Sequence, residues 1–164
     1  MPIIRDAKPD DCTAIFGLIS ELAEYEKLAS AVTGNAAMLR ISLFGETPVA
    51  QCVVIEDSNQ HVFGMALYFF TFSTFLTKRG MYLEDLYVQP QFRGGGHGRA
   101  LLLHLAGKAQ ALDCGRFEWR VLDWNTPAIN FYKSLGAAIM PEWHLVRLDE
   151  DGIAKLSQPN NKEY

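Results

Sequence analysis

Apolar residues recur at intervals of three and four in two long segments of the chain, which is the spacing of one face of an α-helix. In the first segment the apolar positions are Cys12, Ile15, Phe16, Ile19, Leu22 and Ala23, and in the second they are Leu101, Leu102, Leu105, Ala109 and Leu112. We predict one helix that begins at Pro9, with two aspartates at its positive end, and another that Gly115 ends.

Shorter segments rich in β-branched and aromatic residues predict strands. They are 3–6, 49–56, 61–72, 81–88 and 116–122, with a final pair at 137–140 and 143–148. A polar turn at 57–60 joins two of them, and two short helices are predicted at 35–44 and from Thr126-Pro127 to Gly136. Three meandering strands followed by strand–helix–strand units predict an α/β domain with a mixed sheet.

Length and composition suit one ordinary domain with one core. The chain has 164 residues, 49% of them hydrophobic, so we predict a single domain over 1–164 with a polar tail from about residue 157. A net charge of −4 argues against a nucleic-acid surface. No apolar run reaches the length of a membrane span or a signal peptide, so we predict no membrane partner.

Three cysteines stand far apart, and neither they nor the four histidines show the spacing of metal ligands. We therefore predict no disulfide framework and no metal. A reducing, cytoplasmic location is the simpler interpretation of the cysteines.

The stretch QFRGGGHGRALLL, residues 91–103, places four glycines within five positions just where a helix begins. A helix N-terminus presents unpaired N–H groups and partial positive charge, and glycines let that backbone approach an anion closely. Neither the P-loop pattern nor the dinucleotide-binding pattern fits, because no Lys-Ser or Lys-Thr follows and residue 99 is arginine. The stretch predicts a phosphate cradle; the alternative is a flexible glycine turn.

The motif Arg93-x-x-Gly96-x-Gly98, placed after a strand and at the head of a helix, resembles the acetyl-CoA loop of the GCN5-related N-acetyltransferases. The segments ELAEYEKL, MALYFFTFST, YLEDLYV and DWNTPAINFYKSLGA resemble those of the diamine (spermidine/spermine) acetyltransferase group. The likeness runs from about residue 3 to 148. It implies the GNAT fold, a mixed central β-sheet with splayed central strands and helices on both faces.

The resemblance also implies acetyl-CoA as the cosubstrate and places it. The pantetheine arm would pair with the backbone of Leu86, Tyr87 and Val88, and the diphosphate would lie on Arg93, Gly94, Gly95, Gly96, His97, Gly98 and Arg99. Asn125, Thr126, Pro127 and Ala128 would line the arm, with Asn130 and Lys133 as further candidates. The alternatives are a helix cap for Asn125 and an exposed helix face for Asn130 and Lys133.

By the same resemblance, Tyr132 is the candidate acid that protonates the departing CoA thiolate, since a phenol is protonated at neutral pH. A core aromatic role is the alternative for Tyr132.

Glu84 is the candidate base, acting through a water, because a carboxylate inside a strand is costly unless it is paired or takes part in catalysis. Strict alternation puts Tyr82, Glu84, Leu86 and Val88 on one face and Asp85 on the other. A satisfied ion pair or binding of the substrate ammonium are the alternatives for Glu84.

Transfer of acetyl directly to a small primary amine is the function that the resemblance implies. Tyr25, Glu26, Glu84, Asp123 and Glu142 are the candidate ligands of a polyamine- or diamine-like substrate. Thialysine or another amino acid is an alternative substrate, with Arg120 or Arg147 to bind its carboxylate, and a non-catalytic CoA sensor is an alternative function. The dense aromatic segment near 67–75 and the resemblance predict a homodimer.

Overall fold

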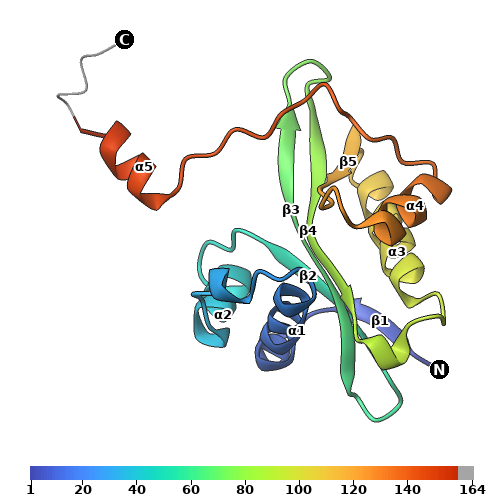
Figure 1. The fold of residues 1–164 in the computed structure, drawn as a ribbon. Helices are drawn as coiled ribbons and strands as arrows, with labels where there is room; N and C mark the ends of the chain where they lie inside the picture. Colours follow the sequence, from blue (N-terminus) through green and yellow to red (C-terminus); the bar gives the residue numbers. More distant parts are fainter. Residues whose placement is uncertain (159–164) are drawn as a thin grey trace. The chain divides into compact units, whose positions relative to one another are not determined.

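The computed structural model describes residues 1–158 and divides the chain into two compact units, Met1–Arg120 and Val121–Tyr164. The first unit contains the whole β-sheet and three α-helices, and the second contains two further helices (Figure 1). Most of the predicted polar tail lies outside the described residues. Among residues 1–158, no helix combines the length and apolar character that crossing a membrane requires.

Five strands form one mixed sheet in sequence order. They are β1 (Ile3–Asp6), β2 (Gln51–Glu56), β3 (Val62–Ser73), β4 (Lys78–Val88) and β5 (Arg116–Trp119). The first four are antiparallel neighbours, and β5 runs parallel to β4. The predicted mixed sheet is confirmed.

The two last strands pair along only part of β4. Gly80–Leu83 lies opposite β5, whereas β4 continues to Val88. The edge of β4 from residue 84 to 88 therefore has no strand partner on that side among the described residues. This is the splayed edge that the sequence predicts.

A β-bulge lies at Glu84. Leu83 pairs with Tyr68 of β3 and Asp85 pairs with Leu67, so Glu84 is an extra residue with no partner opposite. A bulge of one residue reverses the facing of every side chain beyond it relative to those before it.

The alternation predicted for this strand is consequently wrong. Tyr82 lies opposite Phe69, and Asp85 lies opposite Leu67, so that Tyr82 and Asp85 share one face of the sheet. Tyr87 follows on the same face, and the residues at 86 and 88 point to the other.

Helices cover both faces of the sheet (Figure 1). α1 (Cys12–Tyr25) follows a 3-10 turn that begins at Pro9, and α2 (Ala36–Phe44) is capped by the side chain of Asn35, which accepts a hydrogen bond from the Met38 N–H at 3.0 Å. Both starts agree with the prediction. α3 (His97–Ala111) lies on the opposite face.

Each face has its own buried cluster. Residues of α1 and α2 pack with β2, β3 and β4 in a cluster of Ile15, Leu18, Leu43, Cys52, Val54, Val62, Met65, Leu67 and Tyr87. On the other face α3 buries Leu101 and Leu105 completely. Each such side chain stabilises the fold by about 1.5–3 kcal/mol.

The predicted end of α3 at Gly115 is wrong by several residues. The helix ends at Ala111, and Asp113 takes a left-handed conformation with φ of 52°. The Cys114 N–H then donates to the Ala109 carbonyl at 2.9 Å, which closes the helix. Gly115 serves the sheet instead, because its N–H donates to the Arg79 carbonyl at 2.8 Å.

The second unit holds α4 (Thr126–Ser134) and α5 (Glu150–Leu156). Gly136 follows α4 with φ of 88°, which confirms the predicted stop. The strand pair predicted at 137–140 and 143–148 is wrong, because neither segment pairs with a strand within residues 1–158. A β-rich composition makes a strand only where a neighbour satisfies the backbone, and the described sheet ends at β5.

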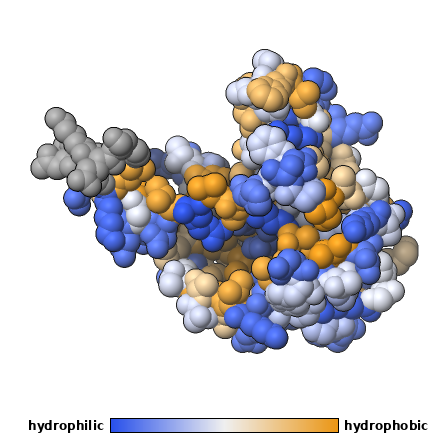
Figure 2. All heavy atoms as spheres, turned by 45° about the horizontal axis from the view of Figure 1, so that its top comes forward, coloured by the Kyte–Doolittle hydropathy of each residue, from blue (hydrophilic) through white to orange (hydrophobic). Residues whose placement is uncertain are grey.

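Apolar side chains also gather at the tip of the β3–β4 hairpin (Figure 2). Phe72, Phe75 and Leu76 are 60%, 96% and 53% exposed. Phe72 and Phe75 belong to the aromatic segment from which the sequence predicts a dimer contact, and Leu76 follows that segment directly.

Candidate functional site

The glycine loop is shaped by backbone conformation. Gly94 and Gly96 have φ of 86° and 75°, and a Cβ at either position would meet no atom within 4 Å. Glycine is therefore required there by the left-handed backbone and not by crowding. Gly96 is the N-cap of α3 and has no side chain that could accept a hydrogen bond from the first turn. The N–H groups at the start of α3 are left to face an anion.

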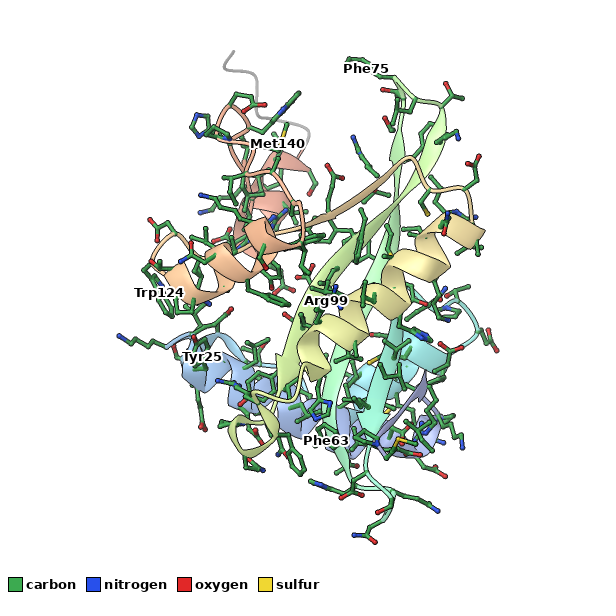
Figure 3. All side chains as sticks on the ribbon, turned by 90° about the vertical axis from the view of Figure 1, so that its right-hand side faces the viewer. Tyr25, Phe63, Phe75, Arg99, Trp124 and Met140 are labelled. Atoms are coloured by element: carbon green, nitrogen blue, oxygen red, sulfur yellow. The ribbon has the colours of Figure 1, made fainter. Side chains whose placement is uncertain are left out.

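Gly95 has a different role. A Cβ on it would lie 2.8 Å from Nε2 of His97. The His97 ring packs edge-on against Phe63 at 5.2 Å between centroids, and Phe63 stacks on Phe92 at 4.2 Å. Phe63 and the first turn of α3 are visible in Figure 3. The absence of a Cβ on Gly95 thus leaves space for the His97 ring, which packs with Phe63 and Phe92 against the loop.

The splayed edge of β4 continues directly into this loop. The Gln89 N–H donates to the Phe63 carbonyl, which makes Val88 and Gly64 a pair without mutual hydrogen bonds. By the antiparallel pattern, the backbone groups of Leu86 and Val88 then point to the open edge, while those of Tyr87 point to β3. Of the residues predicted for the pantetheine arm, Leu86 thus presents its N–H and carbonyl at the open edge, and Val88 presents its N–H, because the Val88 carbonyl accepts a hydrogen bond from Arg93.

Arg93 leaves the loop and turns back toward β4 and α1. Its Nε donates to the Val88 carbonyl at 2.8 Å, and its guanidinium carbon lies 5.3 Å from the ring centres of both Tyr25 and Tyr87. Arg99, in the first turn of α3, is exposed and is labelled with Tyr25 in Figure 3. The two arginines that flank the glycines are consequently not equivalent.

Three carboxylates lie where β4 passes the end of α1. Asp85 is half-buried, and its pKa is raised to about 6, mainly by burial and then by the negative charges of Glu84 and Glu26. Burial also raises the pKa of Glu26, the residue that ends α1. Glu84 is exposed at the bulge. Burial and mutual repulsion make the ionised forms of these carboxylates unfavourable, and a bound cation would relieve that cost.

The position of Asp85 beside Glu26 is a feature that the sequence analysis did not predict. Regular alternation placed Asp85 among apolar neighbours on the wrong face, and only the bulge turns it toward α1. The available clue was the adjacent pair Glu84-Asp85, because two carboxylates in one strand are seldom both satisfied by ion pairs.

The remaining predicted residues belong to the second unit. Asn125 is buried and caps α4, since its side chain accepts a hydrogen bond from the Ala128 N–H at 3.3 Å. Thr126, Pro127 and Ala128 form the first turn of α4, and Asn130 and Lys133 lie further along it. The half-buried Tyr132 ring lies 5.4 Å from that of Phe131. Asp123 precedes α4, and Glu142 lies in the irregular segment before α5.

The structure thus brings together two groups of predicted residues, each within its own unit. The first unit contains the glycine loop at 93–99, the open edge of β4 at 86–88, and the carboxylates of Glu26, Glu84 and Asp85 near Tyr25. The second unit joins the residues of α4. Within residues 1–158, no three His, Cys, Asp or Glu side chains are arranged to hold a metal ion.

Comparison with known proteins identifies relatives of this chain. Residues 19–137 match the family model described as the acetyltransferase (GNAT) family. The thialysine N-epsilon-acetyltransferase of Sus scrofa is 39% identical over 165 residues, which cover 94% of this chain and 96% of the relative. The human spermidine/spermine N(1)-acetyltransferase-like protein 1 is 33% identical over 163 residues, which are 94% of this chain and 23% of the longer relative.

Solved structures agree on the fold. An integron cassette protein from the mobile metagenome of V. cholerae superimposes with a TM-score of 0.80 and 28% identity. The aligned region covers 96% of this chain and 98% of that one.

Proposed function

The chain belongs to the acetyltransferase (GNAT) family and is an acetyl-CoA-dependent N-acetyltransferase, and we propose that its acceptor is a polyamine- or diamine-like small molecule. The observation that supports this acceptor is the group of carboxylates at Asp85, Glu84 and Glu26. An alkylammonium relieves the repulsion among them, and a second ammonium on the same molecule has a second carboxylate to pair with.

The coenzyme fits the first unit on two grounds. The uncapped N–H groups at the start of α3, beyond Gly94 and Gly96, suit a diphosphate. The open edge of β4, with both backbone groups of Leu86 and the N–H of Val88, suits the amides of a pantetheine arm, which would extend the sheet as a further strand. When bound, acetyl-CoA supplies an activated acetyl thioester.

Asp85 is proposed as the base. An alkylammonium has a pKa near ~10 and must lose a proton before its nitrogen attacks the acetyl carbon. A general base works best when its own pKa lies near the working pH, and the pKa of Asp85 at about 6 meets this condition better than an ordinary carboxylate does. Glu84, the base candidate from the sequence, is exposed at the bulge and is proposed to bind the ammonium together with Glu26 and Tyr25.

Tyr132 is proposed as the acid. Asp85 takes the first proton of the ammonium. As the new C–N bond forms and the C–S bond breaks, the phenol gives its proton to the departing sulfur, and the second proton of the nitrogen restores the phenol. Asn125, Thr126, Pro127 and Ala128 are proposed to line the coenzyme arm, with Asn130 and Lys133 beside it. Asp123 and Glu142 are proposed to extend the acidic surface for the acceptor.

A single acetyltransferase domain over both units is proposed, because the matched family region crosses the boundary at residue 120. A homodimer is proposed from the exposed Phe72, Phe75 and Leu76, and a cytoplasmic location from the three free cysteines. Light scattering on the purified protein tests the dimer, and a single-chain mass would refute it.

An amino acid with a side-chain amine is the second candidate acceptor. Arg120 lies over the ring of Tyr82 at 5.5 Å, two residues before the bulge, and offers a cation for a substrate carboxylate. The name of the pig relative points in the same direction.

One substrate panel decides between these acceptors. Purified protein is mixed with acetyl-CoA and with spermidine, putrescine, thialysine or lysine, and thiol release and product mass are followed together. Fastest turnover of spermidine or putrescine supports the proposal, and turnover of thialysine alone supports the second candidate. Coenzyme binding without acetylation of any amine would refute both and favour a sensor.

A further inference from the structure

Arg93 links three elements of the first unit. Its Nε donates to the carbonyl of Val88, the last residue of β4, at 2.8 Å. Its guanidinium carbon lies 5.3 Å from the ring centre of Tyr25, in the last turn of α1, and the same distance from Tyr87. A cation over an aromatic face at this distance is attracted to it.

Further side chains join the same contact. Glu21 of α1 accepts a hydrogen bond from the Gln89 side chain at 2.8 Å, so that the strand end is tied to α1 on a second side. Burial and the negative charge of Glu21 raise the pKa of Tyr87, while Arg93, whose guanidinium lies over the Tyr87 ring, lowers it. The end of α1, the end of β4 and the start of the glycine loop are therefore held as one connected group.

This group lies between the two candidate binding regions. The glycines that follow Arg93 form the coenzyme loop, and Tyr25 immediately precedes Glu26, which shares the amine region with Asp85. Arg93 is the first residue of this loop, so a displacement of the loop by a bound diphosphate would be passed to the guanidinium. That guanidinium in turn contacts the ring next to the amine carboxylates.

We propose that Arg93 is a positioning residue that couples coenzyme binding in the glycine loop to amine binding at the end of α1. This inference rests on the proposed function. Both arginines are exposed, but Arg99 provides the contrast, because its side chain, in the first turn of α3, makes no hydrogen bond or ring contact with residues 1–158. A residue that only attracts phosphate behaves like Arg99.

Coupling is measured without turnover by titrating CoA calorimetrically in the absence and presence of a saturating amine. The amine is spermidine or thialysine, whichever the wild-type protein acetylates faster. The ratio of the two CoA dissociation constants is expected to be about tenfold in the wild type, within the usual range of coupling between sites. In Arg93→Lys the ratio is expected to fall below about twofold, because lysine keeps the charge but lacks the planar group that meets both rings.

Steady-state kinetics supply a second readout. Arg93→Lys should raise the KM of the amine about tenfold and that of acetyl-CoA, measured at saturating amine, by a similar factor, because a coupling free energy between two sites is reciprocal. The matched control Arg99→Lys should weaken CoA equally with and without amine, leaving the ratio unchanged. A ratio near one in the wild type, or an unchanged ratio in Arg93→Lys, would overturn the inference.

A pair of variants at Tyr25 tests the same link independently of how well the arginine variant folds. Tyr25→Phe keeps the ring over which the guanidinium lies, and Tyr25→Leu removes it. The ratio should persist in the first and fall in the second; equal ratios in both would contradict the inference. Failure of the wild type to acetylate any amine of the panel would instead refute the proposed function, which the ratio does not measure.

Discussion

Replacing Asp85 by asparagine should make the protein more stable and less active at the same time. The carboxyl is half-buried beside two other carboxylates, and its pKa stands at about 6 against the ordinary 3.8. An acid whose pKa is raised on folding binds more protons in the folded than in the unfolded chain between these two values. The free energy of unfolding therefore falls as pH rises from about 4 to 6.

The magnitude follows from the shift. Each pKa unit corresponds to about 1.4 kcal/mol, so that the change from 3.8 to about 6 costs on the order of 3 kcal/mol once Asp85 is fully ionised. Asparagine cannot ionise. Asp85→Asn should lack this loss, and its stability relative to wild type should rise by up to about 3 kcal/mol between pH 4 and pH 8.

Activity should change in the opposite direction. Removing a general base lowers turnover by about 10²–10⁴-fold. In the wild type, kcat/KM should fall below a pH of about 6, where Asp85 becomes protonated, and this limb should be missing from the residual activity of the variant. The acceptor amine titrates near ~10 in both proteins, so it cannot account for the difference.

Urea unfolding at several pH values and pH–rate profiles measure the two effects on the same samples. Glu84→Gln is the matched control, one residue away and exposed. It removes one of the charges that raise the pKa of Asp85, so the acid limb should move to lower pH; kcat should persist, and the loss of an ammonium ligand should appear in the KM of the amine. An Asp85→Asn variant with wild-type turnover and an unchanged acid limb would refute the assignment of the base.

Three further predictions concern the acid, the loop and the N-terminal ion pairs. Tyr132→Phe should lower kcat about 100-fold with CoA affinity unchanged by calorimetry, and full activity would remove the phenol from the mechanism. Gly96→Val should abolish measurable CoA binding, since valine resists φ of 75°, and normal affinity would mean that the diphosphate lies elsewhere. Asp11→Asn should lower stability at neutral pH by about 1–3 kcal/mol, because Arg5 holds the pKa of that carboxyl below its ordinary value. The difference from wild type should vanish as acid protonates Asp11, and a pH-independent difference would contradict this cause.

Local patterns predicted the elements whose ends are set by nearby residues. Asn35 caps α2 and Asn125 caps α4 where the sequence places helix starts, and the left-handed Gly136 stops α4. The start of α3 after the glycines is equally local. In each case the residue that decides the boundary lies within three positions of it.

Features that depend on distant partners were not predictable in this way. The end of α3 is decided by Asp113 adopting a left-handed backbone and by Gly115 pairing with Arg79, more than thirty residues away. Segments 137–140 and 143–148 have strand-like composition, yet a strand requires a neighbour that sequence composition does not supply. The position of Arg93 beside the glycines predicted a phosphate ligand. The motif does not predict the contacts of its side chain with the Val88 carbonyl and the rings of Tyr25 and Tyr87.

The bulge at Glu84 shows how a distant partner changes the chemistry of a site. With regular pairing, Tyr82 and Glu84 would share the face that packs against α1, and Asp85 would turn to the α3 side. The extra residue reverses this, so that Asp85 lies opposite Leu67, on the α1 side, where burial and Glu26 raise its pKa. Because the bulge is defined only by how β4 pairs with β3, the identity of the base candidate follows from the register of two strands and not from the motif in which it lies.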